Sequence, residues 1–315
     1  MSATLTASPS PQAKPARARP PRSAREIRPG EAGESLALAS SALTVVAIVC
    51  LWMLMQMLVL GQLSEHRAQH LLYGQLRGEL AVETAPMGPL DYNSKPVVEG
   101  SPVAMLSIPA IGISDLVVVD GTASGDLLNG PGHLRTTQMP GEAGLSVVMG
   151  RAATYGAPFG RINQLRPGDT IEALSQEGEV TYTVKDVRRN GDPIPPAPTG
   201  ATGGRLMLIT GANHGFLSGL RPGTSLYVDA DTKKATPAGG AFASVSPAEF
   251  PMGHDTAGLP LLALLLAILG GLVLAVSIAR RHFRAALVWL VAAPVAIALA
   301  WAMTDQVMRL LPNLM

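Results

Sequence analysis

The stretch Gln176-Glu177-Gly178-Glu179-Val180-Thr181-Tyr182-Thr183-Val184 carries the clearest secondary-structure signal of the chain. Its β-branched and aromatic residues favour a strand, expected over 180–188, and the Gln-Glu-Gly-Glu run before them is typical of a hairpin turn. Six further β-rich runs bounded by turn residues lie around it: 104–108, 116–119, 146–149, 170–173, 205–209 and 225–228. Seven or eight short strands at this spacing predict an all-β sandwich or closed barrel.

The composition outside this β-rich region is that of a membrane protein. The chain is 47% hydrophobic and 15% charged, with a formal net charge of +1, which disfavours a disordered chain. Apolar runs at 36–61, 257–279 and 285–303 are each close to the ~20 residues that cross a bilayer core. A cleaved signal peptide is the alternative for the first run, but no small-residue cleavage site follows it. We therefore expect three transmembrane helices.

Charged residues beside the apolar runs predict the orientation of the chain. Cations outnumber acids in the Pro/Ala/Ser/Arg-rich tail 1–35, which we expect to be disordered, and three arginines lie in the loop 280–284. The positive-inside rule places both segments in the cytoplasm. The expected protein is thus a multi-pass plasma-membrane protein whose N-terminus is cytoplasmic and whose β-rich region, 102–231, is outside the cell. A stalk helix with a linker (62–101), a second linker (232–256) and an extracellular tail (304–315) complete it.

Composition also excludes several classes of function. Aromatic residues make up 4% of the chain and no basic stripe accompanies them, so we expect no nucleic-acid partner. The single cysteine, Cys50, lies in the first apolar run, so the exported region contains no disulfide, cysteine metal site or thiol nucleophile. His133, His214 and Asp120 lack the spacing of metal ligands, and no cofactor is expected.

Six short motifs follow one another through the β-rich region: SIPAIGI (107–113), GPGH (130–133), PGEAG (140–144), TYGAPF (154–159), LRPGD (165–169) and LMLIT (206–210). In this order they resemble the sortases, the cell-surface cysteine transpeptidases of Gram-positive bacteria, and are most similar to class E and class D members. The resemblance covers roughly residues 104–230. It implies an all-β sortase-like eight-stranded barrel ectodomain, to which the apolar runs add three transmembrane α-helices.

The positions at which this resemblance places the catalytic groups hold other residues. The family uses a cysteine thiolate, a histidine and an arginine, and the matching positions here are Gly211, Arg151 and Ser225. Glycine has no side chain, and arginine stays protonated and cannot act as a base. Arg221, four residues before Ser225, is the alternative arginine. The sequence therefore predicts a degenerate sortase domain.

A sortase-like fold whose catalytic positions hold other residues indicates a catalytically inactive protein that binds or scaffolds at the cell surface. Its expected partners, besides the bilayer, are a sortase, a sorted surface protein or another envelope protein. Two alternatives stay open: a transpeptidase or hydrolase with relocated chemistry, in which Thr210 and His214 act, and a barrel that serves only as a spacer. The former substrate groove supplies the candidate binding residues His133, Arg151, Tyr155, Thr210, His214 and Arg221.

Overall fold

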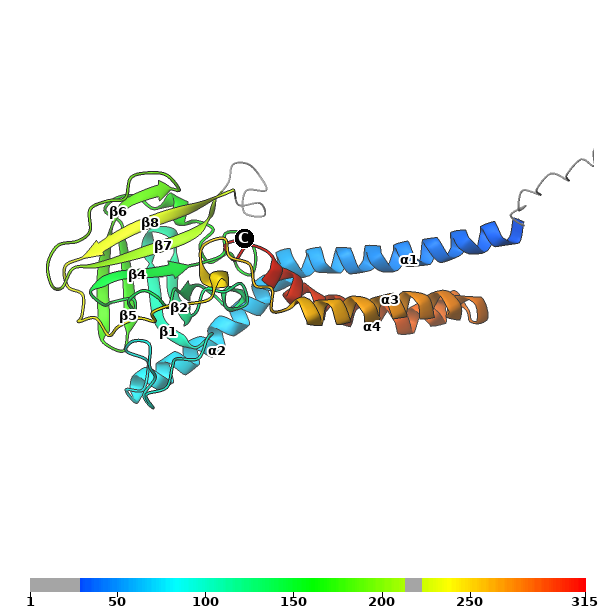
Figure 1. Ribbon diagram of the computed structural model, residues 1–315, viewed down its shortest axis with the longest axis horizontal. Helices are drawn as coiled ribbons and strands as arrows, with labels where there is room; N and C mark the ends of the chain where they lie inside the picture. The colour runs from blue at the N-terminus through cyan, green and yellow to red at the C-terminus, as the bar shows by residue number, and fades with distance from the viewer. Residues whose placement is uncertain (1–28, 213–222) are drawn as a thin grey trace, which may run out of the picture. The chain divides into compact units, whose positions relative to one another are not determined.

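The computed structural model describes residues 29–212 and 223–315. Its β-rich region is a closed barrel of eight strands in the order β1-β2-β3-β4-β7-β8-β6-β5, so the predicted barrel is confirmed (Figure 1). The short strand β3 was not expected, because two residues carry no periodicity. The strands are β1 (Pro102–Ile108), β2 (Ile113–Asp120), β3 (Gly132–His133), β4 (Gly144–Met149), β5 (Thr170–Ser175), β6 (Gly178–Arg189), β7 (Gly204–Ala212) and β8 (Thr224–Thr232).

The barrel interior is filled by alternate residues of its strands. In β6, Val180, Tyr182 and Val184 point inward and are buried, while the residues between them are exposed. The hydroxyl of Tyr182 accepts a hydrogen bond from the backbone N–H of Gly141 at 2.8 Å, which satisfies the one polar group that this ring brings into the core. The alternation that predicted a strand from sequence therefore builds the core directly.

A second apolar layer covers the outer face of β4 and β7. Strand β4 is apolar on both faces, because Val148 points into the barrel while Val147 and Met149 point outward. Met149 packs there with Ile209 of β7 and with Leu314, from the end of the described chain. The segment after α4 thus packs on the barrel. The sequence predicted a tail over 304–315, but residues 304–310 are the last part of α4.

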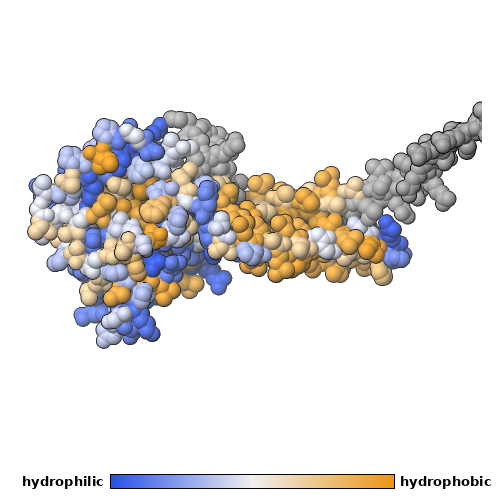
Figure 2. Space-filling model, in the orientation of Figure 1, coloured by the Kyte–Doolittle hydropathy of each residue, from blue (hydrophilic) through white to orange (hydrophobic). Residues whose placement is uncertain are grey.

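The helices are α1 (Pro29–Met55), a π-helical turn η1 (Gln56–Leu60), α2 (Gly61–Ala81), α3 (Leu259–His282) and α4 (Ala285–Leu310). Within the described residues, α3 and α4 are long and apolar enough to cross a membrane, and hydrophobic side chains cover the visible surface of this pair (Figure 2). The third expected span is not of this length. The apolar part of α1 is Ala42–Met55, shorter than the ~20 residues that a bilayer core requires.

Two connections also differ from the sequence expectation. Helix α3 continues to His282, because its basic last turn, Arg280 to His282, interacts favourably with the negative end of the helix dipole. Helix α2 packs on the barrel where a stalk was expected, with Leu76 in a buried cluster with Val117 of β2. The Gln69 side chain accepts from Val117 N–H at 2.8 Å and donates to Val117 C=O at 3.1 Å, replacing a neighbouring strand.

Candidate functional site

The three positions that the resemblance assigns to catalysis meet at one end of the barrel. Strands β4 and β7 run parallel, with Met149 opposite Ile209, so their carboxyl ends lie side by side. Strand β8 runs antiparallel to β7 and places Ser225 opposite Gly211. Arg151 lies two residues after the end of β4. The fold thus brings Arg151, Gly211 and Ser225 to adjoining strand ends.

Thr210 binds the strand ends together. Its hydroxyl donates to the carbonyl oxygen of Gly150 at 2.9 Å, and the N–H of Gly150 donates to Ile209 at 3.0 Å. The side chain of Thr210 is buried, and its proton is already engaged in this bond. Thr210 is therefore placed as a structural link between β7 and the residue before Arg151.

Arg151 is fully buried, and its guanidinium is surrounded by carbonyl and hydroxyl oxygens. Its Nε donates to Leu127 O at 3.1 Å, and its Nη2 donates to the carbonyl oxygen and hydroxyl of Ser124 at 2.8 and 2.9 Å. Its Nη1 donates to the Thr154 hydroxyl at 3.2 Å and to Met315 O at 3.4 Å. Burial lowers the pKa of Arg151 to about 10, so the group is charged at neutral pH.

His133 and Tyr155 are also interior residues. His133 lies in β3, with its Nδ1 3.4 Å from Asp120 Oδ1 and its Nε2 2.9 Å from Gln138 O. The hydroxyl of Tyr155 donates to Asp305 Oδ1 of α4 at 2.9 Å, and burial, reinforced by Asp305, raises the pKa of Tyr155 well above its usual range. The Tyr155 ring also lies 5.7 Å from the Arg151 guanidinium carbon.

The expected groove residues therefore do not line an open groove in this conformation. His133, Arg151, Tyr155 and Thr210 are each at most 3% exposed, because their polar atoms bind partners inside the fold. His214 and Arg221 lie outside the described residues, so a pairing of Thr210 with His214 stays a prediction.

Sequence reasoning missed Ser124, Thr154, Asp305 and Asn313. The Ser124 hydroxyl accepts from Arg151 and donates to Met308 O at 2.8 Å, which joins residues 184 positions apart in the sequence. No local pattern marks Ser124, Asp305 or Asn313, since each binds a partner that only the folded chain brings near. Thr154 begins the TYGAPF motif and lies three residues after Arg151, but its bond to Met315 O joins distant parts of the chain.

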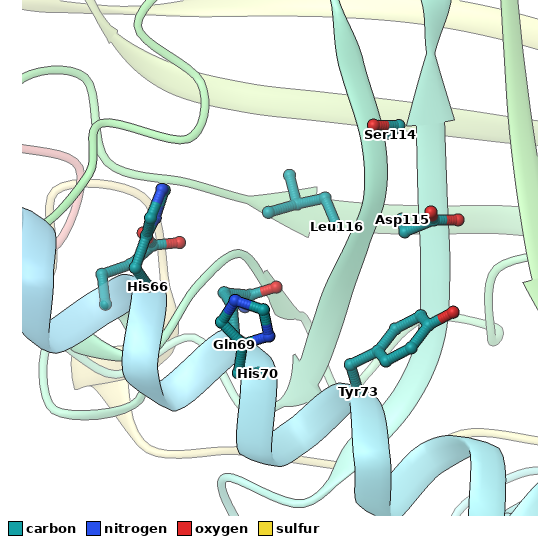
Figure 3. Close-up of a pocket in the computed structure, with 8 residues that line it drawn as sticks. His66, Gln69, His70, Tyr73, Ser114, Asp115 and Leu116 are labelled. Carbon is teal, nitrogen blue, oxygen red and sulfur yellow. The ribbon is translucent and has the colours of Figure 1, made fainter.

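One open groove lies away from the strand ends, between α2 and β2 (Figure 3). It has a volume of about 360 Å³, and α2 presents Gln69, His70 and Tyr73 along it. Within residues 29–212 and 223–315, no three His, Cys, Asp or Glu side chains come together as a metal site. The groove contains none of the three positions at the strand ends.

Comparisons with known proteins agree on one family. A family model described as Sortase domain matches residues 106–212. Sortase D of Bacillus subtilis (strain 168) is 35% identical over 85 residues, which are 27% of this chain and 41% of that relative. The chain thus matches less than half the length of this relative.

Solved structures of sortases are also similar. The sortase D5 transpeptidase of Clostridium perfringens is 18% identical, with a TM-score of 0.40 over 52% of this chain and 97% of that chain. Sortase A of Corynebacterium diphtheriae is 17% identical, with a TM-score of 0.35 over 57% of this chain and 86% of that chain. From the family match and the Bacillus relative we conclude that this chain contains a sortase-family domain, and that residues 106–212 belong to it.

Proposed function

We propose that this chain is a membrane-anchored sortase-family protein that has no transpeptidase activity and acts by binding an envelope protein at the cell surface. The observation that carries the proposal is the position of Arg151, its burial and its hydrogen bonds. It stands where the resemblance places a histidine base, yet it is fully buried and bonded to oxygens of its own chain. A protonated guanidinium cannot take a proton from a nucleophile.

The neighbouring positions support the same conclusion. Gly211 occupies the position of the nucleophile on β7, and the single cysteine of the sequence, Cys50, lies in α1. Ser225, opposite Gly211, cannot supply the positive charge that stabilises an oxyanion. Nucleophile, base and oxyanion donor act as a unit, so loss of the nucleophile alone costs several orders of magnitude in rate.

The orientation in the membrane follows from α3 and α4. Their short connection carries basic residues, Arg280, Arg281 and Arg284, and the positive-inside rule places such a turn in the cytoplasm. The barrel is attached at the opposite end of α4, through the bond from Tyr155 to Asp305. We propose that the barrel lies on the outer side of the plasma membrane, where a surface-protein partner is available.

The activity test uses the full chain purified in detergent. It is incubated with a sorting-signal peptide and an amine acceptor, and intact-protein and peptide masses are measured. We expect unchanged peptide and no acyl adduct on the protein. Thr210→Ala is the matched control and should be indistinguishable from the wild type, because Thr210 links strands and transfers no group.

Two outcomes would contradict the proposal. An acyl adduct on any side chain of the barrel, or peptide cleavage that Thr210→Ala abolishes, would establish relocated chemistry instead. The binding role is tested by cross-linking the full chain in native membranes and identifying the products by mass spectrometry. We expect a sortase or a surface protein with a sorting signal, and products that contain neither would count against this role.

A further inference from the structure

The segment 311–315, after α4, occupies a site formed by loops of the barrel domain. We infer that this is a peptide-recognition site, filled here by the chain's own segment, which accepts a turn-forming peptide of an envelope protein with an Asn-Leu pair. The inference rests on the proposed binding function and names the chemical class of its ligand. The main chain of the segment and the side chains of Asn313 and Leu314 each have contacts in the site.

The main chain of the segment is held by donors that do not depend on its side chains. Leu314 O accepts from the N–H of Ala152 at 3.1 Å. Met315 O accepts from the Thr154 hydroxyl at 2.8 Å and from Arg151 at 3.4 Å. The N–H of Met315 donates to Pro312 O at 3.1 Å, so the segment is bound as a turn. Main-chain hydrogen bonds supply affinity that does not depend on the identity of the side chains.

The side chain of Asn313 is fully buried in a ring of main-chain carbonyls. Its Nδ2 donates to Thr122 O at 2.9 Å, to Phe250 O at 3.1 Å and to Ala248 O at 3.4 Å. A group that fits this ring must donate hydrogen bonds. Aspartate has nearly the same shape as asparagine but only accepts when ionised, so the ring discriminates between the two.

Leu314 supplies the second specific contact. It is fully buried and packs with Leu127, Met149 and Ile209 in the apolar layer outside β4 and β7. Burial of a leucine side chain is worth ~1.5–3 kcal/mol. The pocket therefore selects an apolar residue directly after the asparagine.

The polar walls of the site are loops, so release of the segment would not require the barrel to unfold. The polar contacts come from loops: Thr122 and Ser124 between β2 and β3, Thr154 after β4, and Ala248 and Phe250 before α3. The segment belongs to no strand pair of the barrel. Its release breaks these contacts and leaves the β-ladder intact.

The main test measures exchange of the segment in the full chain. Cys50→Ser and Met315→Cys together leave one thiol, at a residue that is 7% exposed in the wild type. Its labelling rate is measured in detergent at rising concentrations of the synthetic peptide acetyl-Leu-Pro-Asn-Leu-Met. Because the tethered segment competes at an effective concentration of order mM, peptide is added up to several mM. We expect labelling to accelerate at least tenfold and to saturate.

The same peptide with asparagine replaced by aspartate is the matched control, and it should change the rate less than twofold. A labelling rate that is independent of peptide, or equal acceleration by both peptides, would overturn the inference.

A second measurement uses a variant that ends at residue 310. Its folding is checked by hydrogen exchange of β6 and β8, and peptide binding is measured by calorimetry. We expect the asparagine peptide to bind at least tenfold more tightly than the aspartate peptide. A folded variant that binds neither peptide would overturn the site.

Peptide masses recorded in both experiments separate this inference from the proposed function. Intact peptide with accelerated labelling supports both. Cleaved peptide with accelerated labelling would overturn the inactive role while still supporting the recognition site.

Discussion

Replacing Arg151 by methionine tests whether a single buried cation holds the strand ends, the β2–β3 loop and the final segment together. Methionine keeps most of the apolar length of the side chain but removes every donor. The carbonyl oxygens of Ser124 and Leu127 then lose the hydrogen bonds that Arg151 donates at 2.8 and 3.1 Å. Met315 O keeps its bond from the Thr154 hydroxyl.

The expected cost follows from these contacts. Each buried acceptor that loses its donor costs ~1–3 kcal/mol, and relief of the buried charge offsets part of the loss. We expect a net loss of about 3 kcal/mol in the free energy that holds the site closed, with each 1.4 kcal/mol changing an equilibrium tenfold. Opening of the site should therefore become roughly 100-fold more frequent.

Hydrogen exchange with mass spectrometry on the full chain measures this opening directly. The reporters are the N–H of Ala152, bonded to Leu314 O, and the N–H of Asn313, bonded to Gly253 O. Both should exchange roughly 100-fold faster in Arg151→Met, while amides shared by β6 and β8 keep their wild-type rates.

The exposed Arg166 offers the same chemical change on the surface, and Arg166→Met should alter stability by no more than about 0.5 kcal/mol. Exchange at both reporters within twofold of the wild type in Arg151→Met would refute the reasoning. An equal loss of protection at every barrel amide would refute it as well, because the effect would then not be local.

Three further changes test other contacts. Burial and nearby carboxylates raise the pKa of Asp126 from 3.8 to about 7; the native state keeps a proton between about pH 4 and 7 that the unfolded state releases, so stability falls as pH rises through this window. Asp126→Asn should flatten the dependence of the urea midpoint on pH between about pH 4 and 7, and an unchanged slope would contradict this assignment. Tyr155→Phe removes the bond to α4 and should speed exchange in residues 151–160 about tenfold; wild-type rates there would show that the bond is dispensable. Gly150→Ala places a Cβ 2.5 Å from the Phe159 ring and should lower the free energy of unfolding, measured by denaturant titration, by about 1–3 kcal/mol. The control Gly74→Ala meets nothing within 4 Å and should gain stability. Equal midpoints for the two variants would contradict the packing.

Sequence patterns predicted the barrel well where the signal is local. The hairpin of β5 and β6 follows from its turn and β-branched residues, and Gly178 in that turn has a φ of +113°, which favours glycine. Strand β3 was missed, since its two residues, Gly132 and His133, are too few to show a periodicity. The third membrane span was overestimated because the predicted run 36–61 is divided in the structure between α1, the π-helical turn η1 and the start of α2, which hydropathy does not show.

The amino-acid sequence alone determined which residues stand at the three positions that the resemblance assigns to catalysis, because the identity of Gly211, Arg151 and Ser225 is independent of conformation. Only the tertiary structure decided that Arg151 donates hydrogen bonds to oxygens of distant segments. Its partners Ser124 and Met315 lie 27 and 164 residues away, and the apolar layer that seats Leu314 combines residues of several strands and loops. Hydrogen bonds and packing between such distant segments exist only after the chain has folded, so no local periodicity or motif encodes them.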